Sequence, residues 1–159
     1  DETHTENLIL NADVVMKSPG IPEKAPIVKK LLEKGIPVIS EIEFAVQFTN
    51  AKTIGITGSN GKTTSKELIN VVLSKKYKTK ATIGNLNNHI GVPLTLLKLT
   101  SHHEIAIVEM GARHIGDIAH LAEIAKPKIG VVLGVGKAHV GEFGSREVIA
   151  KAKSELIIE

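Results

Sequence analysis

The sequence predicts an α/β protein with a three-layer, mostly parallel sheet and a small leading α/β segment. Three observations predict this fold class. Short β-branched runs alternate with helical patterns, glycine, proline or charged residues bound the runs, and one run leads directly into a glycine-rich turn and a helix. Because a crossover between parallel strands needs a connection of helix length, this alternation is typical of a parallel sheet with helices on both faces.

The expected elements follow in order along the chain. Apolar runs predict strands at ADVVMKS (12–18), IPVIS (36–40), TIGIT (53–57), EIAIVEM (104–110) and IGVVLGV (129–135). Apolar side chains at three- and four-residue spacing predict helices over residues 25–34, 64–76, 117–126 and 145–158. The polar stretch QFTNAKT precedes a new strand. We therefore predict a boundary there, between a partial leading segment, residues 1–50, and a larger domain, residues 51–159.

Composition limits the class of protein. A chain of 159 residues can bury one sizeable core, and its 42% hydrophobic and 23% charged residues are typical of a soluble globular protein. No apolar run is long enough to predict a membrane-spanning helix. The absence of cysteine excludes disulfides and thiolate metal sites, and the acidic start DETHTENLIL lacks the basic and apolar regions of a secretory signal. A cytoplasmic location is therefore expected.

Charge is spread unevenly along the chain. Residues 1–50 hold 5 Lys and 8 acidic residues, a net charge of −3, whereas residues 51–159 hold 15 basic and 9 acidic residues, a net charge of +6. A mild positive bias suits an anionic ligand such as a nucleotide. With three Phe and one Tyr, the chain has few side chains on which nucleic acid bases could stack, so we do not expect nucleic acid binding.

A glycine-rich turn lies between the predicted strand 53–57 and the following helix. Backbone N–H groups at such a turn point outward without partners, and the N-terminus of the helix favours negative charge. Gly58 and Gly61 allow close backbone approach and positive φ, Lys62 adds a positive charge, and the Thr63 hydroxyl can ligate the magnesium of a nucleotide. The turn is predicted to bind polyphosphate; the alternative is a tight turn with a helix cap and no ligand.

Two further candidates lie where a nucleotide site needs them. Glu109 ends the predicted strand 104–110, and His139 follows the predicted strand 129–135. In open α/β sheets ligands bind beyond the carboxyl ends of the strands, so both side chains are expected near the phosphates. Magnesium prefers oxygen, which makes Glu109 the better ligand on chemistry alone. A solvated or helix-capping glutamate and an ordinary histidine are the alternatives.

At this point the motifs resemble those of the Mur ligases, ATP-dependent enzymes of peptidoglycan synthesis. GITGSNGKTT (55–64) resembles that family's own phosphate loop, which accounts for Ile56 where the common phosphate-loop pattern has glycine. Three further stretches resemble MurF, the branch of the family that adds D-alanyl-D-alanine: GNLNNHIGVPLTLLKL (84–99), AIVEMGARHIGDI (106–118) and GKAHVGEFGSREVIAKAKSEL (136–156). The stretches VVMKSPGIP (14–22) and GIPVISEIEFA (35–45) instead resemble the end of the N-terminal domain of the D-glutamate-adding branch, MurD. The chain therefore combines stretches that resemble two different branches of the family.

The resemblance implies a nucleotide and metal site. Thr63 and Glu109 would bind one Mg²⁺ and His139 a second, with Lys62, Lys153 and His139 as the catalytic set. The family lysine that Lys153 matches is carbamylated by carbon dioxide, which turns a cation into an anionic metal ligand. From sequence alone, Lys153 and its neighbour Lys151 would both be surface helix lysines. The residues implied to hold ATP are Thr57, Gly58, Ser59, Asn60, Gly61, Lys62, Thr63 and Thr64.

The resemblance also implies the substrates and the reaction. ATP would phosphorylate the terminal carboxylate of a UDP-MurNAc-tripeptide, and the amine of D-alanyl-D-alanine would attack the acyl phosphate and release phosphate. Asn85, Asn87 and Asn88 would face the muramyl peptide; an Asn-rich turn is the alternative. Gly134 stands where related sequences usually carry an asparagine that would help to order the nucleotide loop. The C-terminal ligase domain is expected to be absent from this chain.

Two other functions remain open at this level. The first is a nucleotide-binding fragment that holds Mg-ATP without turnover. The second is a MurD-type ligase adding D-glutamate, which only residues 1–50 favour. A measurement of turnover would distinguish a nucleotide-binding fragment from a ligase, and the identity of the amine substrate would distinguish the two ligases.

Overall fold

The computed structural model describes residues 2–17, 20–47, 49–136 and 143–158, and the chain divides into two compact units, residues 1–47 and 48–159. Each unit has its own sheet. The division falls within the polar stretch QFTNAKT. The assignment of the first unit to the MurD branch stays a prediction.

The first unit has few buried side chains. Its elements are α1 (Glu2–Ile9), β1 (Val15–Lys17), α2 (Pro26–Glu33), β2 (Val38–Ser40) and α3 (Glu41–Val46). The two strands pair in parallel, with Val15 opposite Val38. Helix α2 begins at Pro26, whose missing N–H costs nothing in the first turn of a helix, and it buries Val28 and Leu31.

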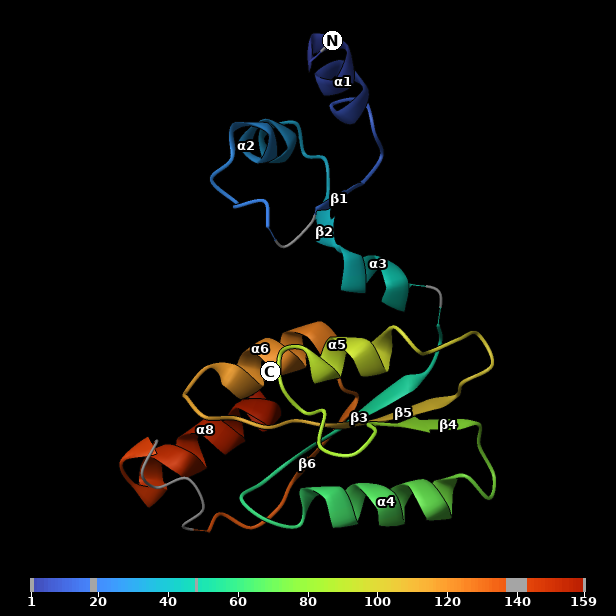
Figure 1. Ribbon diagram of the computed structural model, residues 1–159, viewed down its shortest axis with the longest axis vertical. Helices are drawn as coiled ribbons and strands as arrows, with labels where there is room; N and C mark the ends of the chain where they lie inside the picture. Colours follow the sequence, from blue (N-terminus) through green and yellow to red (C-terminus); the bar gives the residue numbers. More distant parts are fainter. Residues whose placement is uncertain (1, 18–19, 48, 137–142, 159) are drawn as a thin grey trace. The chain divides into compact units, whose positions relative to one another are not determined.

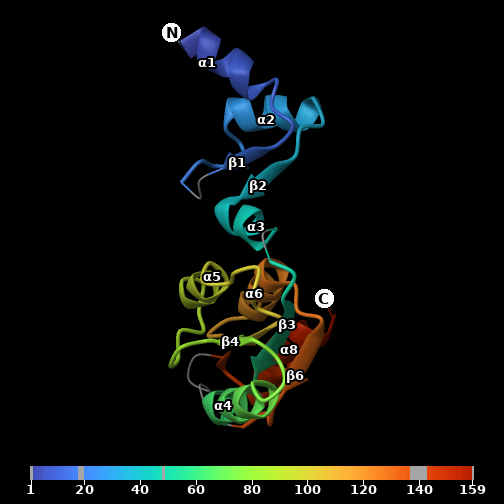
Figure 2. The ribbon, with the colours of Figure 1, turned by 90° about the vertical axis from the view of Figure 1, so that its right-hand side faces the viewer.

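The second unit holds a parallel sheet between helices. Its described elements are β3 (Lys52–Thr57), α4 (Lys62–Leu73), β4 (Thr79–Ala81), α5 (Gly91–Leu96), β5 (Ile105–Glu109), α6 (Asp117–Ala125), β6 (Ile129–Val132) and α8 (Arg146–Ile158). The strand order is β4-β5-β3-β6, with every pair parallel. Helix α4 lies on one face of the sheet and α5 and α6 on the other, while α8 packs against α6 and β6 (Figures 1 and 2). The predicted three-layer α/β fold class is confirmed.

Strand β3 is the centre of the core because both of its faces are covered. On the face toward α4, Ile54 and Ile56 form a cluster with Ile107, against which Ile69 and Leu73 of that helix pack. The alternate residues Thr53, Gly55 and Thr57 are also buried, so burial is continuous along β3 from Thr53 and does not alternate. This burial is why TIGIT could be recognised as a strand.

The order of the strands creates a switch point next to β3. From β3 the chain passes through α4 to β4, which is one edge strand of the sheet. From β5, the neighbour of β3, it passes through α6 to β6, which is the opposite edge strand. The loops that leave β3 and β5 therefore diverge at the carboxyl edge, which is where ligands bind in open α/β sheets. The glycine-rich turn forms the first of these loops, and Glu109 is the last residue of β5, where the second begins.

Among the described elements, four were not among the predicted strands and helices: α1, α3, β4 and α5. Strand β4 has the sequence TKA and offers no apolar run to recognise; it forms because it pairs with β5, Thr79 lying opposite Ile105. Helix α5 contains Gly91 and Pro93, residues with low helix propensity, yet most of it is buried. Tertiary contacts override local propensity at both places. Within the described residues, no helix is long and apolar enough to cross a membrane.

Candidate functional site

The glycine-rich turn folds as a loop from Gly58 to Gly61 between β3 and α4. A Cβ atom at Gly58 would lie 2.7 Å from the Cβ of Leu133, and Gly58 has φ +155, so a larger residue does not fit. Gly61 is the residue before α4, with a left-handed φ of 78, and no side chain caps the helix. A hydrogen bond fixes the loop to the segment that follows β6: the Ser59 N–H donates to the Gly134 carbonyl at 3.1 Å. Because no side chain caps α4, the N–H groups of its first turn are available to an anion.

Lys62 lies over this loop. Its Nζ donates to the Gly58 carbonyl at 2.8 Å and to the Ser59 carbonyl at 3.4 Å. The ammonium is therefore held beside the turn that the sequence predicts to bind phosphates. A positive charge there adds to the partial positive charge of the helix N-terminus.

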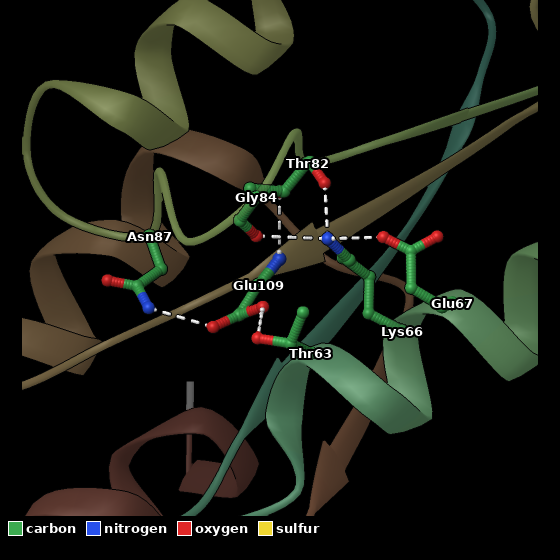
Figure 3. Close-up of polar contacts among 7 residues, drawn as sticks. All are labelled: Thr63, Lys66, Glu67, Thr82, Gly84, Asn87 and Glu109. Atoms are coloured by element: carbon green, nitrogen blue, oxygen red, sulfur yellow. Dashed lines mark hydrogen bonds and ion pairs between the residues drawn. The ribbon is translucent and has the colours of Figure 1, made fainter.

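Glu109 is the centre of a hydrogen-bond network at the end of β5. Its side chain is 1% exposed, so the interpretation as a solvated glutamate is wrong. Oε2 accepts from the Thr63 hydroxyl at 3.0 Å and Oε1 from the Asn87 amide at 2.8 Å, while the Glu109 N–H donates to Thr82 Oγ1 at 3.0 Å (Figure 3). The structure thus brings the predicted metal ligands Thr63 and Glu109 together and places Asn87 against them.

These residues fit a magnesium ion bound with a nucleotide. A hydroxyl and a carboxylate, 3.0 Å apart, supply the oxygen ligands that Mg²⁺ prefers. Close by at the end of β3, the Thr57 hydroxyl is buried and has no hydrogen-bond partner among the described residues. Buried hydroxyls are normally bonded, so this one has an unused donor at the start of the phosphate loop.

A cleft of about 800 Å³ opens beside the loop. It brings together the predicted residues Lys62, Asn85, Asn87, Asn88 and Lys153, which come from three separate stretches of the chain. The other residues that line it are Leu86, His89, Gly111, Ala112, Arg113, His114, Asp117, His120 and Leu121. Lysine, arginine and histidine outnumber the single acid in this lining, so the cleft suits an anionic ligand.

Lys153 is buried, with 3% of its surface exposed, and the expectation of a surface lysine is wrong. Burial is the largest cause, and the positive charge of Lys62 adds to it; although Asp117 and Glu155 partly oppose the change, the pKa of Lys153 falls from 10.5 to about 8. Its Nζ lies 5.8 Å from the centre of the Phe143 ring. A lysine with this pKa is partly neutral near pH 7.5, and only the neutral amine reacts with carbon dioxide. Its neighbour Lys151 is exposed.

Asp117 shapes the wall of the cleft at the start of α6. Its Oδ2 accepts from the backbone N–H groups of Arg113 at 2.7 Å and His114 at 2.9 Å. Burial alone would raise the pKa of this carboxyl, but these two bonds, with the charges of His114 and Lys153, outweigh it and lower the pKa below its ordinary value. The group is therefore anionic at neutral pH and fixes the turn that carries Arg113.

Comparison with known proteins agrees with this geometry. A profile of the Mur ligase middle domain matches residues 56–159. This chain belongs to the Mur ligase family. A UDP-N-acetylmuramoyl-tripeptide--D-alanyl-D-alanine ligase of Mycobacterium bovis is 57% identical over 103 residues, which are 65% of this chain and 20% of that protein. A UDP-N-acetylmuramoylalanine--D-glutamate ligase of Bacteroides thetaiotaomicron is 41% identical over 140 residues, 88% of this chain and 30% of that protein.

Solved structures of Mur ligases share the fold. MurF from Acinetobacter baumannii superimposes with a TM-score of 0.70 at 31% identity, covering 92% of this chain and 39% of that one. MurF ligase from Thermotoga maritima, solved in complex with ADP, has a TM-score of 0.66 at 30% identity, covering 94% of this chain and 41% of that one. This Mur ligase chain thus spans less than half the length of these relatives.

The remaining predicted residues of this Mur ligase chain are placed less directly. His139 lies outside the described residues. Asn60 and Thr64 are exposed on the loop and the first turn of α4. Asn88 lines the cleft, but its Oδ1 also accepts from the N–H groups of Ile90 and Gly91 at 3.1 and 2.9 Å, so it also holds the turn that leads into α5.

Sequence reasoning missed several polar residues that the fold brings to the site. Arg113, His114, Asp117 and His120 line the cleft, and Lys66 lies buried beneath the loop that follows β4. The short run ARHIGD between a strand and a helix was a signal for the cleft residues, because loops at the carboxyl edge carry function. Lys66 gave no such signal, since a lysine on an amphipathic helix is ordinarily exposed.

Proposed function

We propose that this chain is the nucleotide-binding part of a MurF-type ligase, which joins D-alanyl-D-alanine to a UDP-MurNAc-tripeptide at the expense of ATP. One observation carries the proposal: Glu109 accepts a hydrogen bond from Thr63, a predicted metal ligand, and another from Asn87, a predicted substrate-binding residue. A metal-bound nucleotide and a carboxylate acceptor can therefore be held beside one another at the edge of the sheet. Because ATP and UDP-linked precursors are cytoplasmic metabolites, we place the reaction in the cytoplasm.

The phosphate loop would hold the nucleotide. Its backbone N–H groups and the N-terminus of α4 bind the phosphates, and Lys62 neutralises charge on the transferring phosphoryl group. Thr63 and Glu109 would hold the Mg²⁺, which supplies further charge neutralisation when it is bound. The side chains would contribute little acid or base catalysis to this reaction.

The acceptor would lie in the cleft. Its terminal carboxylate takes the γ-phosphoryl group of ATP to give an acyl phosphate and ADP; the amine of D-alanyl-D-alanine then attacks the acyl carbon, and inorganic phosphate leaves as the amide bond forms. The cationic side chains Lys62 and Arg113 line the cleft and would orient the anionic substrate. Lys153, once carbamylated, would present an anion instead of a cation to a metal.

Two other functions have a specific observation in their favour. The similarity to a D-glutamate-adding ligase over 88% of this chain favours a MurD-type enzyme. The contacts of the glycine-rich loop and Lys62, which involve no acceptor, are equally those of a nucleotide-binding protein without turnover. In both cases the phosphate loop has the same role, so the amine substrate and phosphate release are the measurements that separate them.

The test is a calorimetric titration of Mg-ATP into the purified chain, followed by a phosphate-release assay with UDP-MurNAc-tripeptide and D-alanyl-D-alanine. Lys62→Ala should abolish saturable binding, and Lys75→Ala, at an exposed lysine after α4, should leave it unchanged. Binding with substrate-dependent phosphate release establishes the ligase. Binding without release leaves the fragment, release only with D-glutamate and its acceptor supports the MurD-type enzyme, and no binding at all overturns the phosphate site.

A further inference from the structure

Lys66 is a buried cation outside the phosphate site. It lies on α4, one turn after Thr63, and its side chain is 0% exposed. Burying an ammonium is costly unless its protons are bonded. Nζ donates to the carbonyl oxygens of Thr82 at 2.6 Å and Gly84 at 3.0 Å, and it pairs with Glu67 Oε1 at 2.8 Å (Figure 3). These acceptors match the three donors of the ammonium.

Both carbonyls belong to the loop of residues 82–90, here named the acceptor loop, which carries the three predicted substrate-binding asparagines. Lys66 fastens the start of this loop to α4. Other bonds fasten it to the end of β5: Asn87 accepts from the Gly111 N–H at 2.7 Å and donates to Glu109, and Thr82 Oγ1 accepts from the Glu109 N–H.

We infer that Lys66 is a positioning residue for the acceptor: it sets where Asn87 meets Glu109. The inference rests on the proposed function, because it assigns the acceptor loop to substrate. One helix, α4, carries both Thr63 at the metal side and Lys66 beneath the loop. Because both residues lie on this helix, the position of the acceptor loop relative to Thr63 is fixed. Glu67 lies on α4 beside Lys66, so its ion pair does not connect α4 to the loop, and the two carbonyl bonds hold the loop.

Two neighbouring amides report on the loop in the absence of any substrate. The Gly111 N–H donates to Asn87 of the acceptor loop, whereas the adjacent Met110 N–H donates to Ile56 of β3 at 2.8 Å. In Lys66→Met, hydrogen exchange measured by NMR should accelerate about tenfold at Gly111 and stay unchanged at Met110, because only the loop is released. Glu67→Gln, which keeps both carbonyl bonds, and Lys75→Met should leave both amides unchanged.

Binding supplies the functional readout. Lys66→Met should weaken calorimetric binding of UDP-MurNAc-tripeptide about tenfold and leave Mg-ATP binding within about threefold of the parent chain. Equal acceptor affinity in both chains would overturn the positioning role, as would unchanged exchange at Gly111. Acceleration at Gly111 and Met110 together would also overturn it, because Lys66 would then support the whole fold. If the parent chain binds no acceptor, the proposed function fails, and the amide pair still decides whether Lys66 holds the loop.

Lys66→Arg answers the question if Lys66→Met does not fold. The guanidinium keeps the charge, but its planar fork cannot donate to carbonyls placed for a tetrahedral ammonium. Faster exchange at Gly111 with an unchanged rate at Met110 is expected. Parent-like exchange at both amides, with weakened acceptor binding, would overturn the inference because the loop would be held without Lys66.

Discussion

Two buried lysines of the second unit differ in their surroundings. Lys66 is bonded to two carbonyl oxygens and a carboxylate, and its contacts hold a loop. Lys153 lies near an aromatic ring and near the positive charge of Lys62, and its pKa falls to about 8. The same residue type thus serves as a structural donor in one place and as an amine that is easily deprotonated in the other.

Lys153→Met should stabilise the chain at pH 7. Because the folded-state pKa of Lys153, about 8, lies below its ordinary value of 10.5, the protonated amine opposes folding below pH 8, and this cost disappears as the pH rises toward 10.5. The gain in the free energy of unfolding should be at most about 3 kcal/mol at pH 7 and near zero above pH 10.5. Urea unfolding in buffers free of carbon dioxide measures it. The exposed Lys151→Met is the control, and an equal effect of both substitutions would contradict the prediction.

The metal-ligand candidates show what can be predicted for single residues. Thr63 and Glu109 follow from the oxygen preference of magnesium and from the position of each at the end of a strand or the start of a helix. Their hydrogen bond brings the two oxygens together, and magnesium binding stays a prediction. The burial of Lys66 and Lys153 could not be predicted in this way, because the exposure of a helical lysine depends on what packs over it.

At the scale of elements, the phosphate loop depends on how closely β3 and the segment after β6 approach each other. Gly58→Ala should destabilise the chain by about 1–3 kcal/mol, because its Cβ would lie 2.7 Å from the Cβ of Leu133 and its φ is +155. Gly134→Ala should change stability by less than about 1 kcal/mol, since no atom lies within 4 Å of its Cβ position. Thermal unfolding of both variants tests this, and similar losses in the two would show that the loop tolerates the contact.

Most strands and helices of the second unit could be predicted because burial repeats along them. The run TIGIT is covered on both faces, and the segments that form α4, α6 and α8 have helical spacing. β4 and α5 could not be predicted from pattern: one is three residues long, and the other contains glycine and proline. Both exist because β5 and the sheet provide partners.

At the scale of the whole molecule, the contacts of the candidate site among the described residues lie within the second unit, residues 48–159. A shortened chain of residues 48–159 should therefore bind Mg-ATP within about twofold of the full chain. Residues 1–47 alone should be largely unfolded by circular dichroism, because Val28 and Leu31 are the buried apolar side chains among its described residues. A tenfold loss of Mg-ATP affinity in the shortened chain would show that the first unit takes part in the site.

The sequence by itself determined the fold class, the glycine-rich turn and the family, because these depend on local patterns: apolar periodicity, glycine between a strand and a helix, and motifs read in order. Only the tertiary structure decided that Thr63, Glu109 and Asn87 meet, that a cleft joins Lys62 to Lys153, and that Lys66 is buried under the acceptor loop. These features depend on which strands are neighbours and on what covers each helix. Both are set by contacts between residues far apart in the chain, which no local pattern records.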